Sequence, residues 1–176
     1  NTLKNRIMTE EKYDDYSLNG GIEEAEQLFD TDSTPSAMLR YACMGTVLAS
    51  CPSEYEGVLE VPEGVEILAS NCFRYCTKLT GIIIPSTLKV ISRDSFRNTS
   101  SLTHFTVSHD NQYFSTSEDG KALFNIEKTI LIKVATDIEE YVVPETVITI
   151  KNYAFHRSKA LKRIYFSNNL KEILSC

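Results

Sequence analysis

One block of residues repeats along the chain at an offset of 23. Residues 58–79 and 81–102 carry the same residue types in register, and the pattern returns after residue 143. The repeated positions are a corner proline (Pro62, Pro85, Pro144), a phenylalanine (Phe73, Phe96, Phe155) and a leucine (Leu79, Leu102, Leu161). A unit of roughly 20 to 30 residues cannot bury its apolar face alone, so such units stack on one another as a solenoid. The period therefore predicts a repeat array, an architecture that usually binds other molecules.

Each repeat begins with a short extended segment rich in branched and aromatic residues, which ends at a proline or serine. Because side chains alternate along a strand, every second residue of these segments should face the core. The predicted inward pairs are Leu59/Val61, Ile82/Ile84, Phe105/Val107, Tyr141/Val143 and Ile164/Phe166. A second apolar ladder should lie three and six residues beyond the corner, at Val65/Leu68, Leu88/Ile91, Val147/Ile150 and Leu170/Ile173.

The repeat that starts at His104 departs from the pattern, because it lacks the phenylalanine turn and carries an insertion at about residues 108–137. Asp119-Gly120 marks a turn, and the apolar runs 122–124 and 130–132 flank a polar stretch at 125–129. This arrangement predicts a β-hairpin. We expect the hairpin to replace the missing turn and to keep the strand ladder continuous.

Residues 1–56 follow a different pattern and carry 11 Asp/Glu against 4 Lys/Arg. Residues 22–29 have helical spacing, and Thr34-Pro35 is a typical helix start for a second helix from about Ser36 to Ser50. The apolar stripe of that second helix would be Met38, Tyr41/Ala42, Gly45 and Leu48/Ala49. We therefore predict two parts: an acidic, partly helical cap at 1–56 and a solenoid at 57–176 that stops within its last repeat. The alternative for residues 1–56 is an acidic docking segment.

The sequence contains no pattern typical of an active site. His104, His109 and His156 have no cysteine or carboxylate at metal-ligand spacing, and no phosphate-binding loop or nucleophile elbow is present. The five cysteines are an odd number, which favours reduced structural thiols over a closed disulfide framework. We predict no catalytic residues, no cofactor and no metal, and therefore a protein that is not an enzyme.

Charge and hydropathy exclude two further classes of partner. Residues 57–176 carry 13 acidic and 14 basic residues, and their one basic cluster is Arg157, Lys159, Lys162 and Arg163. Nucleic-acid binding requires a more concentrated basic surface. No apolar run approaches the roughly 18 residues of a membrane span, so membrane insertion is not expected. The last ladder (Ile164, Phe166, Leu170, Ile173) is expected to be exposed unless further repeats, a partner or a second copy cover it.

The phrase that runs from Pro144 through Val147, Ile150, Ala154-Phe155, Leu161 and Ile164 to Phe166 resembles the BspA-type leucine-rich repeat, as does the stretch from Pro62 to Pro85. Residues 110–114 and 119–125 resemble the hairpin insert common in that family. Ser92 and Lys151 depart from the family's usual glycine, and Ser108 and Ser167 from its corner proline. The resemblance covers about residues 57–176. It implies a mainly β, right-handed solenoid, often displayed at the cell surface or secreted, that acts in adhesion and has no catalytic residues to carry over.

The outward residue of each first strand defines the predicted protein-binding face, one residue per coil in a single line: Glu60, Ile83, Thr106, Val142 and Tyr165. Three of these five are bulky and apolar, and an exposed apolar patch is typical of an interaction site. The alternatives are that strand propensity selects these residues or that residues 1–56 cover them. The leading hypothesis is a leucine-rich-repeat module for adhesion or scaffolding. The alternative is an intracellular component of a larger assembly such as the cytoskeleton, which the unpaired cysteines favour. A glycan at the sequon Asn98-Thr99-Ser100 would distinguish the two.

Overall fold

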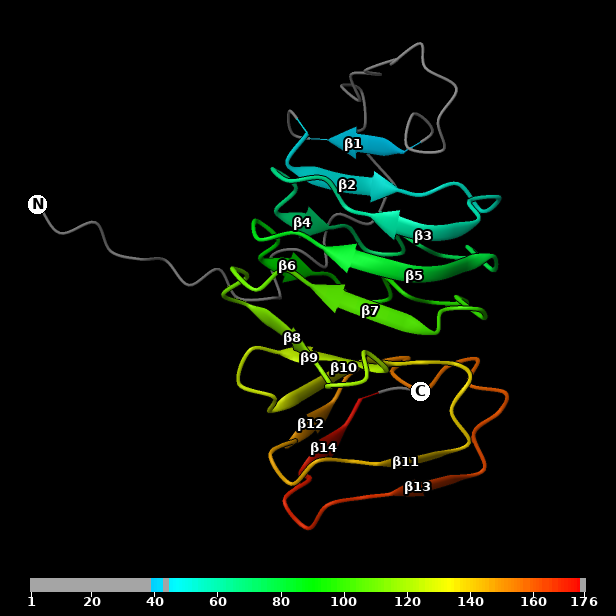
Figure 1. Ribbon diagram of the computed structural model, residues 1–176, viewed down its shortest axis with the longest axis vertical. Coiled ribbons are helices and arrows are strands. Elements are labelled where there is room, and N and C mark those ends of the chain that lie inside the picture. Colours follow the sequence, from blue (N-terminus) through cyan, green and yellow to red (C-terminus); the bar gives the residue numbers. More distant parts are fainter. Residues whose placement is uncertain (1–38, 43–44, 175–176) are drawn as a thin grey trace, which may run out of the picture.

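The computed structural model describes residues 39–42 and 45–174, and all of their regular structure is β. Figure 1 shows the strands stacked in successive layers along the long axis of the molecule. The strands are β1 Arg40–Ala42, β2 Val47–Ser50, β3 Gly57–Glu60, β4 Ile67–Leu68, β5 Leu79–Ile84, β6 Val90–Ile91, β7 His104–Val107, β8 Phe114–Thr116, β9 Ala122–Asn125, β10 Ile130–Val134, β11 Glu140–Val142, β12 Thr149–Ile150, β13 Arg163–Tyr165 and β14 Glu172–Ile173.

Each regular turn of the chain contributes one strand to each of two parallel ladders. The first segments form the ladder β3-β5-β7 and the separate pair β11-β13. The strands after the corner form the ladders β2-β4-β6 and β10-β12-β14. Parallel neighbours need a crossover connection, which here is the rest of each repeat. The predicted β solenoid is therefore confirmed.

Most of the predicted inward residues line the interior, whereas Phe166 and Ile173 of the last ladder are exposed. Leu59, Ile82 and Phe105 are buried and lie opposite one another on β3, β5 and β7. Phe73 and Phe96 are also buried, and their rings stack with centroids 5.6 Å apart. The core is divided into two clusters, with the Phe73/Phe96 column in the first and Phe155 packed against the second.

Each phenylalanine lies in a turn that contains two left-handed residues four positions apart. The pairs are Asn71/Tyr75, Asp94/Asn98 and Tyr153/Arg157, with φ between 59° and 66°. Asn and Asp tolerate this conformation better than other residues with a side chain, whereas Tyr and Arg incur strain. A small buried residue, Cys72, Ser95 or Ala154, precedes each ring, as the register predicted.

The helix predicted for about residues 36–50 is wrong in its described part. Arg40–Ala42 and Val47–Ser50 form the antiparallel strands β1 and β2. Gly45 has a φ of +85°, which suits a turn, and Leu48 is buried opposite Leu68 of β4. The open edge of β4 offers parallel hydrogen bonds to residues 47–50, and this tertiary pairing outweighs the helical spacing of the apolar residues. The helix predicted at 22–29 lies outside the described residues, and the division at residue 56 stays a prediction.

The insertion contains three strands, with β8 antiparallel to β9 and β9 antiparallel to β10. The expected continuity of the strand ladder is wrong, because β7 does not pair with β11 and β6 does not pair with β10. The turn at Gly120 occupies the edge of β7 instead, where Phe105 N donates to Gly120 O at 2.8 Å. A Cβ on Gly120 would lie 2.3 Å from His104 Cε1, and Gly120 has a φ of +68°, so this close approach requires glycine.

Candidate protein-binding face

The first strands hold the five predicted face residues in two groups. Glu60, Ile83 and Thr106 lie opposite one another across β3, β5 and β7. Val142 lies opposite Tyr165 across β11 and β13. Neighbouring strands are about 4.8 Å apart, so residues within each group are side by side. The single line predicted from the repeat is therefore two lines, separated by the insertion.

The five residues differ in how much side chain they present to solvent. Val142 is 68% exposed and Tyr165 is 49% exposed, whereas Ile83 is half-buried. Glu60 and Thr106 are exposed and polar. The strongest apolar exposure among the five is therefore at Val142 and Tyr165.

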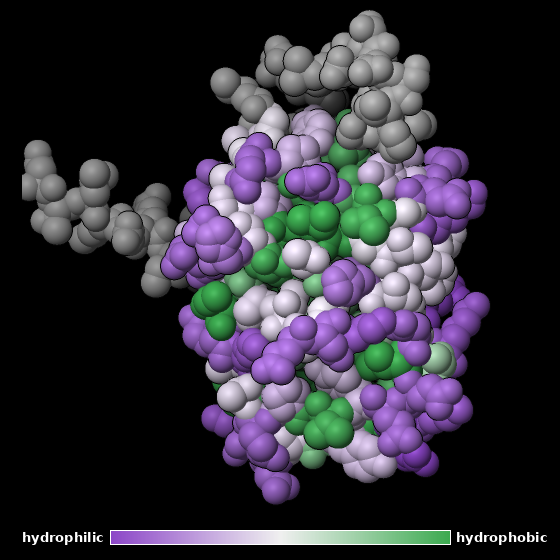
Figure 2. Space-filling model, in the orientation of Figure 1, coloured by the Kyte–Doolittle hydropathy of each residue, from purple (hydrophilic) through white to green (hydrophobic). Residues whose placement is uncertain are grey.

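The repeat register did not single out Val58, which precedes Glu60 by two residues on the same face and is also exposed. Its partner across β5 is Gly81, and a Cβ there would lie 3.2 Å from a Val58 methyl carbon. Strand alternation alone could have identified Val58. Figure 2 shows a hydrophobic area over β3 and β5, with a smaller one over β11. Together with the strand pairing, this gives two apolar areas, the Val58/Ile83 patch and the Val142/Tyr165 patch.

Charge pairs that cross from β11 to β13 accompany the Val142/Tyr165 patch. Arg163 pairs with Glu140, and Lys162 Nζ lies 2.9 Å from Glu139 Oε2. All four side chains are solvent-exposed, so these pairs add little to stability. They neutralise one another beside the patch, which leaves its apolar side chains as the distinctive feature.

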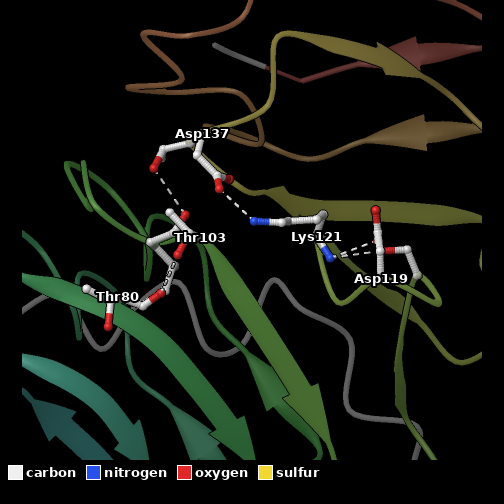
Figure 3. A network of polar contacts seen from close by, with 8 residues as sticks. Thr80, Thr103, Asp119, Lys121 and Asp137 are labelled. Atoms are coloured by element: carbon white, nitrogen blue, oxygen red, sulfur yellow. Dashed lines mark hydrogen bonds and ion pairs between the residues drawn. The ribbon is translucent and has the colours of Figure 1, made fainter.

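A network of polar contacts lies where the insertion meets the start of β7 (Figure 3). Lys121 Nζ lies 2.6 Å from Asp137 Oδ2, and the Lys121 backbone N–H donates to Asp119 Oδ1 at 3.0 Å. The hydroxyl of Ser117 also donates to Asp119, and this bond holds the pKa of that carboxyl below its ordinary value. On the β7 side, Thr103 donates to the carbonyl oxygen of Thr80. The insertion thus separates the two patches by a hydrogen-bonded polar surface.

The predicted basic cluster does not form a single cationic surface. Arg157 Nε donates to Asn98 Oδ1 at 3.1 Å, while Lys162 and Arg163 pair with glutamates on β11 or next to it. The hydrogen bond from Arg157 holds the side chain of Asn98, the glycan acceptor of the sequon, and Asn98 is only 7% exposed. Glycan occupancy at Asn98 is therefore a weak test of compartment.

Lys133 is the buried ionisable side chain that the sequence did not reveal. Its Nζ donates to the carbonyl oxygens of His156 at 2.9 Å and Tyr153 at 3.2 Å. Burial lowers the pKa of Lys133 to about 7. Burial and the charges of Lys133 and nearby arginines lower the pKa of His156 as well. A lysine with such a pKa can be catalytic, but Lys133 is 1% exposed and its two partners are carbonyls, so it acts as a structural donor.

The described residues also bear on metal binding and membrane insertion. Within residues 39–42 and 45–174, no group of three or more His, Cys, Asp or Glu side chains could hold a metal ion. The same residues contain no helix long and apolar enough to cross a membrane. His109 lies beside Asp110 and is exposed, whereas His156 Nδ1 accepts from Asn98 N at 3.4 Å.

Solved structures with the same fold come from several bacteria. A leucine-rich repeat protein of Eubacterium ventriosum superposes with a TM-score of 0.62 at 24% identity, over 66% of this chain and 31% of that one. For the pneumococcal vaccine antigen PcpA the TM-score is 0.58 at 23% identity, over 69% and 36% of the two chains. For a leucine-rich cell surface protein of Faecalibacterium prausnitzii it is 0.55 at 19% identity, over 69% and 38%. At these identities the likeness shows the fold alone.

The chain spans about a third of the length of each of these structures. No curated protein matches the chain significantly. The family model described as the BspA type leucine-rich repeat region matches six copies of the repeat, at residues 53–119 and 124–176. The chain is a solenoid of about six turns and belongs to the BspA-type leucine-rich repeat family.

Proposed function

We propose that this chain is a non-enzymatic interaction module that binds a protein partner through its strand face, in adhesion or scaffolding. The observation that carries this proposal is the Val142/Tyr165 patch. Two large apolar side chains lie side by side on parallel strands and remain 68% and 49% exposed. Nothing in the packing of the solenoid requires apolar residues at these outward positions.

The composition of the patch is that of an interface anchor. Tyrosine is enriched at interfaces because it buries a large apolar area while its hydroxyl keeps a hydrogen-bond partner. Val142 beside it adds apolar area at low entropic cost, since a β-branched side chain is already restricted. The pair Glu140/Arg163 on the same face would form part of a polar rim. The cell-surface character of the Faecalibacterium protein is consistent with an adhesive role.

Single charged substitutions on the face test the proposal. The partner is first identified by affinity capture from the native source with mass spectrometry, and its affinity is then measured by titration. We expect Val142→Glu and Tyr165→Glu each to weaken binding at least about tenfold, because a charge would be buried without a partner. The matched control is Ile126→Glu, which also places a charge on an exposed apolar residue but lies in the β9–β10 turn.

Circular dichroism should show that all three variants remain folded, since each site is exposed. Wild-type affinity in both face variants would exclude the Val142/Tyr165 patch as the binding site. Equal weakening by Ile126→Glu would place the effect outside the strand face.

The second candidate is an intracellular structural component, and the cysteines favour it. Cys51, Cys72 and Cys76 are all free and buried, as expected in a reducing compartment. Immunolocalisation of the native full-length protein distinguishes the candidates, because surface labelling of intact cells supports adhesion and cytoplasmic labelling supports assembly.

A further inference from the structure

Two thiols from neighbouring turns approach each other next to β2, in the first described part of the solenoid. Cys51 directly follows β2, and Cys76 lies in the phenylalanine turn of the next repeat. Cys76 Sγ lies 3.4 Å from the carbonyl oxygen of Pro52 and 3.5 Å from that of Cys51. Cys51 Sγ lies 3.7 Å from the same Pro52 oxygen, so the two thiols approach one carbonyl group.

The backbone of both turns holds the two sulfurs in place. Cys51 N donates to Cys72 O at 2.8 Å, which joins the two layers directly beside the thiols. Cys76 N donates to Phe73 O at 3.0 Å, and the left-handed residue Tyr75 precedes it. Cys76 is fully buried and Cys51 is 7% exposed, so a small oxidant has an approach from the Cys51 side.

We propose that Cys51 and Cys76 form an oxidisable dithiol, which a peroxide converts into a disulfide that links the first described turn to the next repeat. One sulfur attacks the peroxide, takes one oxygen atom as a sulfenic acid and releases an alcohol, or water when the oxidant is hydrogen peroxide. The second sulfur then attacks the sulfenic sulfur, and the hydroxyl leaves as water with the proton of the second thiol. In total the dithiol loses two hydrogen atoms and the peroxide is reduced.

The environment assigns the first step to Cys76. The neighbouring Cys51 thiol lowers the pKa of Cys76, and the thiolate is the form that attacks a peroxide. The Cys76 thiol in turn raises the pKa of Cys51, and burial raises it further. The other ionisable groups that face the pair are Cys72, Tyr41, Tyr55 and Glu54. Cys72 is fully buried, and its pKa is raised by that burial, so it is the least reactive of the three thiols.

The position of the dithiol gives the disulfide a physical effect. The disulfide would tie the first described turn covalently to the next repeat and restrict the unfolded chain. The two cysteines are 25 residues apart. A cross-link that closes a loop of this length should raise the melting temperature by about 5–10 °C.

The test uses the full chain, treated with hydrogen peroxide at low molar excess. We expect the intact mass to fall by two hydrogen atoms and dithiothreitol to reverse the change. Digestion with trypsin and a glutamate-specific protease separates Cys51, Cys72 and Cys76 among the five cysteines, because Arg74 and Lys78 flank Cys76, and Glu54 and Glu66 separate Cys51 from Cys72. The cross-linked species should join the Cys51 peptide to the Cys76 peptide.

Three alanine variants give the controls. Cys72→Ala should still form the cross-link, whereas Cys51→Ala and Cys76→Ala should not. The melting temperature is compared before and after oxidation within each protein, so loss of stability in a variant does not affect the result. Two outcomes would overturn the proposal: a cross-link through Cys72, or sulfinic acid on wild-type Cys76 without any cross-link. Peptide mapping of the wild-type chain detects both outcomes, even where a variant does not fold.

Discussion

Truncation of Phe96 should destabilise the first core cluster strongly, because its ring contacts both Phe73 in the neighbouring turn and Phe105 on β7. Phe96 is buried, stacks on Phe73 at 5.6 Å and meets the edge of Phe105 at 6.3 Å. Removing a buried phenylalanine typically costs about 3–5 kcal/mol, of which each aromatic pair accounts for about 0.5–1.5 kcal/mol. A domain of ordinary stability has about 5–15 kcal/mol in total. We therefore expect Phe96→Ala to lose a fifth or more of the free energy of unfolding.

Urea denaturation followed by far-ultraviolet circular dichroism measures this loss. The matched control is Phe166→Ala, because Phe166 belongs to the last ladder, which the sequence predicted to be exposed, and its side chain is 53% exposed. That substitution should change the free energy of unfolding by no more than about 0.5 kcal/mol. Phe96→Leu should lie between the two, since leucine fills most of the space without restoring the ring contacts. A loss below about 1 kcal/mol for Phe96→Ala would refute the idea that the stacked rings hold the turns together.

The division of the core into two clusters adds a sharper test. Phe73 and Phe96 share a contact, so their double alanine variant should show a coupling energy of about 0.5–1.5 kcal/mol. Phe155 packs instead on Tyr141, at 5.7 Å in the second cluster, so Phe73→Ala and Phe155→Ala should be additive. Strong coupling between Phe73 and Phe155 would show that the core is continuous through the insertion.

Two buried polar residues, Lys133 and Asn111, give predictions that the same denaturation assay can test. The pKa of Lys133 is lowered from 10.5 to about 7, so the chain takes up a proton on unfolding between these two pH values. The free energy of unfolding should therefore rise with pH from about pH 7, by up to about 1.4 kcal/mol per pH unit. Lys133→Met should lack this contribution, and identical slopes for the two proteins between pH 7 and 8.5 would contradict the prediction. The Asn111 side chain donates to Pro85 O and Leu88 O and accepts from Tyr113 N and Phe114 N. Asn111→Ala should therefore lower the free energy of unfolding by about 2–4 kcal/mol, because it leaves buried backbone groups without partners. The control is Gln112→Ala at an exposed site, which should change the free energy of unfolding by close to zero.

The sequence predicted the regular turns well because their signal is redundant. Leu59, Ile82 and Phe105 occupy the same position in three repeats, and each is buried as strand alternation requires. A repeated position averages out the local ambiguity that affects a single segment. The outward positions of Val142 and Tyr165 follow from the same register, and their role in binding stays a prediction.

The segment before the first full repeat shows where such reasoning fails. The spacing of Tyr41, Gly45 and Leu48 fits a helix, yet residues 47–50 form a strand that pairs with β4. A periodicity count considers only the segment itself, whereas the unpaired edge of β4 is a property of the next turn. Lys133 and Asn111 were missed for a related reason: each is buried because it donates to carbonyls of another turn, and no local pattern shows where those carbonyls lie.

The insertion changes the solenoid on two sides in opposite ways. The repeat at His104 has no phenylalanine turn, so the turn around Phe96 contacts the turn around Phe155 directly: Arg157 bonds to Asn98, and the Arg97 guanidinium lies 5.2 Å from the centre of the Tyr153 ring. On the strand side, β8 to β10 and the Gly120 turn lie between β7 and β11. The side with the phenylalanine turns therefore has one layer fewer at this point, whereas the strand side contains the inserted residues. This difference explains why neither ladder runs through the junction. The Val58/Ile83 and Val142/Tyr165 patches consequently belong to separate ladders. A partner that contacts both patches must span the polar surface around Lys121 and Asp137. A partner that contacts only one patch should tolerate substitutions in the other.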